Sequence, residues 1–163
     1  MVNQLFELTS FGMLMWVLLI ILPNWRITKW LVRTAAFPIF IAILYTIGLI
    51  QVFTDQGFGF MRDFGSVSGV LKLLIDPNIA IVVWIHLLAF DQLAALYIYR
   101  DNMEGRYLPV PLQSAIFIMC FLFGPGGLLV YSILKWARII VQRLRATSKT
   151  DPNLNNHHST RSR

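Results

Sequence analysis

The sequence predicts an all-α fold: an integral membrane bundle of four transmembrane helices, with a short interfacial helix and a basic C-terminal tail. Of the 163 residues, 56% are apolar and 13% are charged, which is about half the charge of a typical soluble domain. Four apolar runs approach the length of about 20 residues that crosses a bilayer as a helix. The runs do not alternate with polar residues, so strands that face lipid are excluded.

Positive charge is concentrated near the C-terminus. The net charge is +6, and the segment from Lys135 onward holds seven basic residues against one acid, Asp151. The rest of the chain is neutral, which excludes a basic groove for nucleic acid. Cys120 is the only cysteine and lies in an apolar run, so a disulfide scaffold is also excluded.

The first two spans are predicted at about residues 5–22 and 35–53. The first has Glu7 near its outer end and Pro23 after it, and it lacks a basic leader and a cleavage site, so we expect it to be retained. The second carries Pro38 in its opening turn, where proline is tolerated. The linker between them is typical of the headgroup level. Its aromatic and basic residues are Trp25, Arg26, Lys29, Trp30 and Arg33.

The longest linker, residues 54–78, is too apolar at residues 57–60 to be a solvated loop. Val67, Val70, Leu71 and Leu74 follow helical spacing within it. This pattern predicts a short helix that lies either at the membrane interface or against the bundle.

The third and fourth spans are predicted at about residues 79–99 and 111–134. Asp76 is a candidate N-cap for the third, with Pro77 at the first helical position. The fourth is interrupted by residues 124–127, where small residues allow close packing of helices. We expect Pro125 to kink this span.

The membrane domain is expected to end near residue 145, followed by a disordered polar tail, 146–163. Lys135, Arg138 and Arg145 share a helix face, which predicts contact with anionic lipid. Four spans put both termini on the side with more Lys and Arg, nine against five, so both termini are expected to be cytoplasmic or stromal. His157 and His158 of the tail are weak metal candidates.

Two ionisable side chains lie inside the third span, where each costs about 2.5–3.5 kcal/mol to insert. His86 and Asp91 are five residues apart, which separates them by about 140° around the helix and about 7.5 Å along it. They therefore meet different neighbouring helices or flank one groove. Burial favours the neutral forms, a proton donor at Asp91 and a proton acceptor at His86. Both residues could instead be structural, through hydrogen bonds between helices.

Other motifs are weak. Gly57 and Gly59 resemble the start of a dinucleotide loop, but the required strand and third glycine are missing. His86 has no partner at the spacing of metal ligands. We therefore expect no cofactor and no metal. Arg100 and Asp101 are expected to anchor the third span at the interface.

Three strings are more informative: LPNW at 22–25, WIHLLAFD at 84–91 leading to YRD at 99–101, and FGPGGLLVY at 123–131. Together they resemble the abscisic-acid-deficient-four family of plants, algae and cyanobacteria. The resemblance covers nearly all of the chain up to about Trp136. It implies a four-helix protein of the thylakoid or of a bacterial inner membrane.

Plant members of this family are required to convert violaxanthin to neoxanthin, which opens an epoxide to an allene. That reaction needs an acid at the oxygen and a base at a proton on a neighbouring carbon, with no obligatory redox cofactor. The resemblance implies Asp91 as the acid and His86 as the base of a carotenoid isomerase. The candidate substrate-binding residues are Trp84, Phe90, Tyr97 and Asn24.

Three functions follow as expectations. The first is an enzyme that acts on a carotenoid or another isoprenoid lipid, alone, as a homo-oligomer or as a subunit of a membrane complex. The second is a non-catalytic pigment-binding, assembly or photoprotection protein. The third is an ion or proton pathway, which four spans could form only as an oligomer.

Overall fold

The computed structural model describes residues 2–150, and these are helical almost throughout, with no strand among them. The helices are α1 (Val2–Thr9), α2 (Gly12–Ile21), α3 (Arg26–Thr34), α4 (Ala36–Gln56), the 3-10 helix η1 (Gly59–Gly65), α5 (Val67–Ile75), α6 (Pro77–Gly105), α7 (Val110–Phe123) and α8 (Pro125–Thr150). The prediction of an all-helical protein is confirmed.

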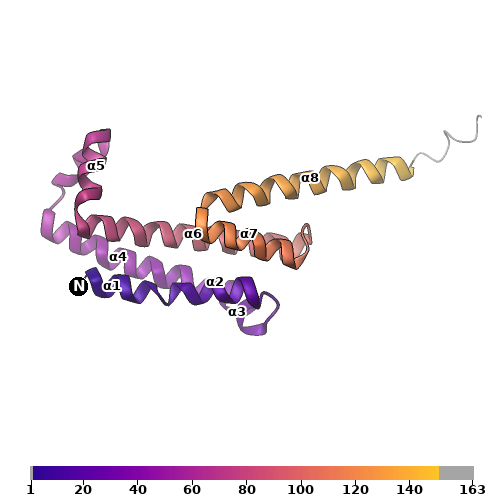
Figure 1. Ribbon diagram of the computed structural model, residues 1–163, viewed down its shortest axis with the longest axis horizontal. Coiled ribbons are helices and arrows are strands. Elements are labelled where there is room, and N and C mark those ends of the chain that lie inside the picture. The colour runs from indigo at the N-terminus through magenta and orange to yellow at the C-terminus, as the bar shows by residue number, and fades with distance from the viewer. Residues whose placement is uncertain (1, 151–163) are drawn as a thin grey trace, which may run out of the picture.

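Three helical segments of the described chain are long and apolar enough to cross a membrane. They are Gln4–Ile21, formed by α1 and α2, then α4 and α6. They lie side by side, with α4 antiparallel to the other two (Figure 1). The packing is close where Gly48 of α4 meets Val82 of α6, since a methyl group on Gly48 would lie 2.9 Å from a Val82 methyl.

The predicted fourth span, residues 111–134, is not one helix. It is divided into α7, which ends at Phe123, and α8, which begins at Pro125 and packs back along α7 (Figure 1). The turn falls at Gly124, with φ 50° and ψ −110°, a backbone conformation open essentially to glycine. Pro125 cannot continue α7 because it lacks an N–H and its ring would clash with the preceding turn. The sequence analysis interpreted this break as a kink, and the count of four spans is not confirmed.

The two ends of the described chain therefore lie at opposite ends of the bundle. The start of α1 is near α5, whereas α8 extends past the far end (Figure 1). The side of the membrane on which each terminus lies stays a prediction. α8 also continues to Thr150, past the predicted start of the tail at residue 146. The rest of the tail, with His157 and His158, lies outside the described residues.

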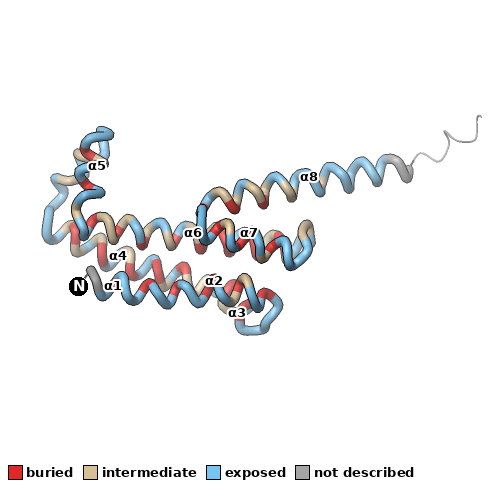
Figure 2. The backbone as a smooth tube through the Cα atoms, in the orientation of Figure 1, coloured by how far each residue is buried: buried red, intermediate tan, exposed pale blue. Residues whose placement is uncertain are grey.

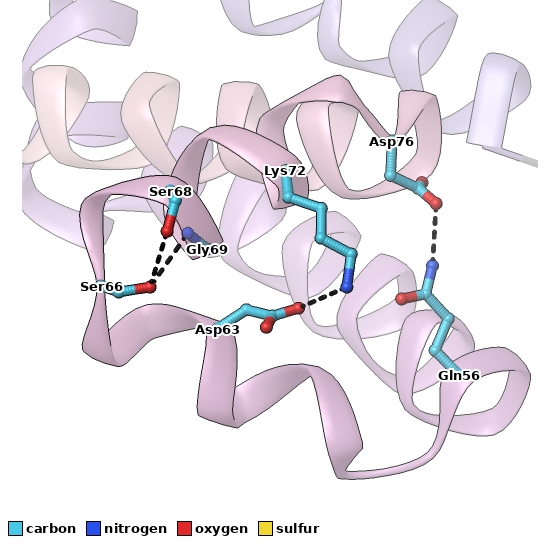
Figure 3. Close-up of polar contacts among 7 residues, drawn as sticks. All are labelled: Gln56, Asp63, Ser66, Ser68, Gly69, Lys72 and Asp76. Carbon is cyan, nitrogen blue, oxygen red and sulfur yellow. Dashed lines mark hydrogen bonds and ion pairs between the residues drawn. The ribbon is translucent and has the colours of Figure 1, made fainter.

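The longest linker forms η1 and α5, so the predicted short helix is confirmed. Leu73 of α5 is buried, whereas Val67, Leu71 and Ile75 are exposed (Figure 2). α5 thus packs on the bundle through one face and presents apolar side chains on the other. Ser66 caps α5 by accepting a hydrogen bond from the Gly69 N–H at 3.0 Å (Figure 3).

Two side-chain contacts bind the same linker together. Lys72 pairs with Asp63 at 3.3 Å, and the amide of Gln56 donates to Asp76 at 3.0 Å (Figure 3). Asp76 also accepts hydrogen bonds from the backbone N–H groups of Asn78 and Ile79. Asp76 is therefore the N-cap of α6, as predicted.

The largest core cluster joins α2, α6, α7 and α8, where Met15, Phe117 and Tyr131 are completely buried. A second cluster packs α1 and α4 on α6, and a third fills the space beneath α5. Much of α4 is exposed (Figure 2). Its exposed residues include the large apolar Ile43, Ile47 and Ile50. An exposed apolar surface of this extent is typical of a protein that faces lipid.

Candidate functional site

Asp91 lies in a cavity of about 300 Å³ between α2, α6 and the turn from α7 to α8. We call this space the Asp91 cavity. Asp91 is the only ionisable residue of its lining. The lining residues are Met13, Trp84, Leu87, Leu88, Asp91, Phe121, Leu122, Phe123, Gly124 and Pro125.

The Asp91 carboxyl faces the turn that reverses the chain. A methyl group on Gly124 would lie 2.5 Å from Asp91 Oδ1, so the absence of a side chain at Gly124 makes room for the carboxyl. α8 starts at the next residue, and the positive end of its helix dipole therefore lies beside Asp91. The result is one partly buried acid that faces an otherwise apolar space, which is open at the surface beside Trp84, Leu122 and Phe123. Such a group can donate or accept a proton at an apolar ligand.

A smaller cavity of about 80 Å³ adjoins the first and shares Met13, Trp84 and Leu88 with it. Its lining includes Gln92 and Trp16, both of which are buried. The Gln92 amide nitrogen donates to the Gly12 carbonyl at 2.9 Å. Gln92 Oε1 and Trp16 Nε1 have no hydrogen-bond partner among the described residues.

The two residues that line the smaller cavity thus carry an unpaired acceptor and an unpaired donor, and buried groups of this kind gain from a hydrogen-bond partner. The sequence analysis missed Gln92 and Trp16 as site residues. Gln92 could have been identified from the sequence, because it is a polar amide next to Asp91 within an apolar span.

His86 lies on another side of α6. Its ring contacts the rings of Tyr45 of α4, with centroids 5.1 Å apart, and of Phe90, at 4.7 Å. His86 does not line the Asp91 cavity. Of the two geometries left open by the spacing, the structure has the one in which the two ionisable groups meet different helices.

The other candidate residues fall in three places. Trp84 joins Asp91 in its cavity, and Phe90 contacts His86. Tyr97 lines a separate cavity of about 370 Å³ near the end of α6. Asn24 lines a cavity of about 700 Å³ between α3, α6, α7 and α8. The structure thus brings together Asp91 and Trp84, and it does not bring Tyr97 or Asn24 to either of them.

Asp101 forms a network at the end of α6 that the sequence analysis did not identify. It accepts hydrogen bonds from the Tyr131 hydroxyl and from Lys135 Nζ, the latter at 2.7 Å. Lys135 also lies over the Tyr107 ring, 4.9 Å from its centroid. The hydrogen bond to Asp101 raises the pKa of Lys135, and burial with this bond raises that of Tyr131. Lys135, which was expected to contact anionic lipid, therefore holds α8 to α6.

Arg100 has a similar role on another side of α6, toward α3. Its guanidinium donates to the carbonyl of Val32 at 2.6 Å and to that of Arg33 at 3.2 Å. These carbonyls lie in the last turn of α3, so Arg100 ties the end of α3 to α6. Arg100 and Asp101 thus join helices to one another, in addition to any role at the interface.

The three strings singled out in the sequence meet in space. The Tyr99 hydroxyl donates to the carbonyl of Pro23 at 2.5 Å, which joins the third-span string to the first. Asp91 faces Gly124, and Asp101 binds Tyr131, which joins it to the last. The strings therefore describe one packed unit. No group of three metal-ligating side chains occurs within residues 2–150.

Comparison with known proteins agrees with this picture. The model of the ABA DEFICIENT 4-like family matches residues 4–131. The chain is similar to the Arabidopsis thaliana protein ABA DEFICIENT 4, chloroplastic, with 26% identity over 124 residues, which cover 74% of this chain and 54% of the relative. The chain thus spans about half the length of that relative. No solved structure matches it.

Proposed function

Because this chain belongs to the ABA DEFICIENT 4-like family, we propose that it acts in carotenoid metabolism, on a xanthophyll or a related isoprenoid within a membrane, with Asp91 as the acid. The observation that carries the proposal is the Asp91 cavity, in which one carboxyl faces a space otherwise lined by apolar and aromatic side chains. An apolar substrate reaches such a cavity from lipid, through the exposed apolar surface of the bundle.

The proposed reaction is the isomerisation of an epoxy-carotenoid. The protonated Asp91 gives its proton to the epoxide oxygen, and one carbon–oxygen bond breaks. A base then removes a proton from a neighbouring carbon, and the electron pair of that carbon–hydrogen bond forms the new double bond of the allene. The product has the same atoms as the substrate, so no oxidant or reductant is consumed.

Gln92 and Trp16 support binding of a hydroxylated end ring. Gln92 Oε1 and Trp16 Nε1 are buried without partners and adjoin the Asp91 cavity. A substrate hydroxyl would donate to the first and accept from the second, which fixes the ring next to Asp91.

The experiment expresses the full chain in a host that makes the epoxy-carotenoid and follows the pigments by chromatography. We expect Asp91→Asn to abolish the product, because the amide keeps the shape of the carboxyl and cannot supply the proton. Asp55→Asn is the matched control, since Asp55 is an exposed carboxyl at the end of α4. An Asp91→Asn protein that accumulates normally and still makes the product would contradict the proposal.

The base is tested separately. His86 is the only imidazole within residues 2–150, and we keep it as the candidate base, although its ring lies against Tyr45 and Phe90, outside the Asp91 cavity. His86→Phe preserves ring contacts with Tyr45 and Phe90 and removes both nitrogens. Loss of product in this variant is the expected result. Unchanged conversion would leave His86 a packing role only.

Pigment binding without catalysis is the second candidate, and one observation favours it: the candidate base does not line the Asp91 cavity. In that case the carotenoid copurifies with the protein unchanged, and the absorption spectrum of the purified protein shows it. Conversion of added epoxy-carotenoid by the same preparation would exclude this second candidate.

We further propose that the end of the bundle with α3 and α8 is cytoplasmic or stromal. Within the described chain, only Arg62 and Lys72 lie at the end with α5, and the other Lys and Arg residues lie on the side of α3, the turn after α6, and α8. This strong bias follows the rule that basic residues remain on the inner side of a membrane. It supports an N-terminus on the outer side, in contrast to the expectation from four spans.

A further inference from the structure

The cavity of about 700 Å³ at the end of the bundle is lined by three basic side chains and by no acid. Lys29 comes from α3, Arg106 from the turn after α6, and Arg138 from α8. None of the three side chains has an ion pair or a hydrogen bond to another described residue. We call this space the basic cavity.

Lys29, Arg106 and Arg138 are exposed, and their like charges around one space favour the binding of an anion there. Neither acid at this end of α6 lies in the lining: Asp101 is bound to Tyr131 and Lys135, and Glu104 lines a different cavity. The folded chain therefore brings three positive charges from distant parts of the sequence together without supplying their counter-charge.

A second, independent observation also points to a ligand with oxygen acceptors. Gln113 lines the basic cavity and is 1% exposed. Its Oε1 accepts a hydrogen bond from Asn102 Nδ2 at 2.5 Å, which fixes the orientation of the amide. Its Nε2 is a buried donor with no partner among the described residues. A buried donor without a partner is costly, and a ligand oxygen would remove that cost.

The position of the cavity identifies the source of the anion. The cavity lies at the end of the apolar spans, and α7 begins there with Val110, so the positive end of a helix dipole adds to the three charges. Trp25, just before α3, and Trp30 of α3 are exposed, as is typical of aromatic residues at the headgroup level. Leu108, Pro109 and Val110 give the cavity an apolar wall.

We propose that the basic cavity binds the phosphate group of an anionic phospholipid, with Lys29, Arg106 and Arg138 as charge partners and Gln113 as a further donor. Basic pockets between transmembrane helices bind lipid headgroups by this chemistry. The site is independent of the Asp91 cavity and of the proposed reaction. It differs from the sequence-based expectation, which placed anionic lipid on Lys135, Arg138 and Arg145 along one face of α8, and it shares Arg138 with that expectation.

The test uses the full-length protein in neutral detergent. Phosphatidylglycerol, phosphatidylcholine or inorganic phosphate is added, and binding is followed by native mass spectrometry and by the thermal unfolding midpoint. We expect phosphatidylglycerol to bind and to raise the midpoint, and the other two to have little effect. Arg106→Gln and Arg138→Gln should each weaken phosphatidylglycerol binding about tenfold, the loss expected for a hydrogen bond to a charged group.

The control variant is Arg143→Gln, which removes one exposed charge from α8 outside the cavity. Its affinity should stay within about twofold of the unchanged protein. Equal losses in all three variants would mean diffuse attraction to α8 and would overturn the proposal, as would wild-type affinity in the two cavity variants. If inorganic phosphate competes and the cavity variants lose that effect, the site takes phosphate, and the lipid source is overturned. The thermal unfolding midpoint of each variant with phosphatidylcholine alone should equal that of the unchanged protein, which shows that the substitution leaves the fold intact.

Discussion

At the scale of single residues, Gly124 has two roles that no other residue can combine. It adopts a positive φ at the turn between α7 and α8, and it leaves room for the Asp91 carboxyl. A β-carbon at position 124 would therefore disturb both the turn and the space that the Asp91 carboxyl occupies. Gly127, one turn into α8, serves packing alone, since a methyl group there would overlap Cys120 of α7.

Gly124→Ala tests this dual role. We expect it to lower the free energy of unfolding by about 1–3 kcal/mol from backbone strain alone, with a further loss as the Asp91 side chain moves. Gly126→Ala is the matched control, because its new methyl group would lie 3.4 Å from Phe123 Cβ, with no positive φ. Thermal unfolding in detergent measures both variants. A Gly124→Ala protein as stable as Gly126→Ala would contradict the dual role.

At the scale of elements, α6 organises the molecule. It packs against every other long helix, and its polar residues each face a different neighbour. Gln92 binds α2, Arg100 binds the end of α3, and Asp101 binds α8. These contacts explain how the span tolerates Gln92, Arg100 and Asp101, since each of them has a hydrogen-bond partner on a neighbouring helix.

The start of α6 depends on its cap. Asp76→Ala removes the hydrogen bonds to the N–H groups of Asn78 and Ile79, and we expect a loss of about 1 kcal/mol in the free energy of unfolding. The contact with Gln56 is exposed and should add little. Asp55→Ala, which removes an exposed carboxyl in the same region, should leave stability unchanged. Unfolding by heat or denaturant compares the two, and equal effects would exclude a specific role for the cap.

At the scale of the whole molecule, the hairpin of α7 and α8 decides the topology. α7 has 14 residues and is about 21 Å long, short of the apolar core of about 30 Å. The chain therefore enters the bundle, reverses at Gly124 and leaves at the end from which it entered (Figure 1). A reversal at this depth is tolerated where its backbone is buried in protein, and Gly124 is buried.

Cysteine labelling distinguishes this topology from four spans. Ser68→Cys places an exposed thiol on α5, and Gln142→Cys places one on α8, while the native Cys120 is buried. In sealed, oriented vesicles, we expect a membrane-impermeant maleimide to label only one of the two variants from outside. Labelling of both from the same side would restore the four-span arrangement.

Local patterns in the sequence determined much of the fold. Runs of apolar residues identified the three spans because hydropathy over about 20 residues is a local property. Helical spacing identified α5, and the order of Asp76 and Pro77 identified the start of α6. The five-residue spacing of His86 and Asp91 correctly allowed the two side chains to face different neighbouring helices, since helix geometry alone fixes the angle between them around the helix axis.

Only the tertiary structure decided what the polar residues face. Hydropathy counts apolar residues equally whether a helix continues or turns back, so residues 111–134 were taken as one span instead of the two arms of a hairpin. The Asp91 cavity and the basic cavity both depend on that reversal, because it brings Gly124 to Asp91 and Arg138 to Lys29 and Arg106. Such contacts join residues far apart in the chain, and their energy is set by packing that no local window contains.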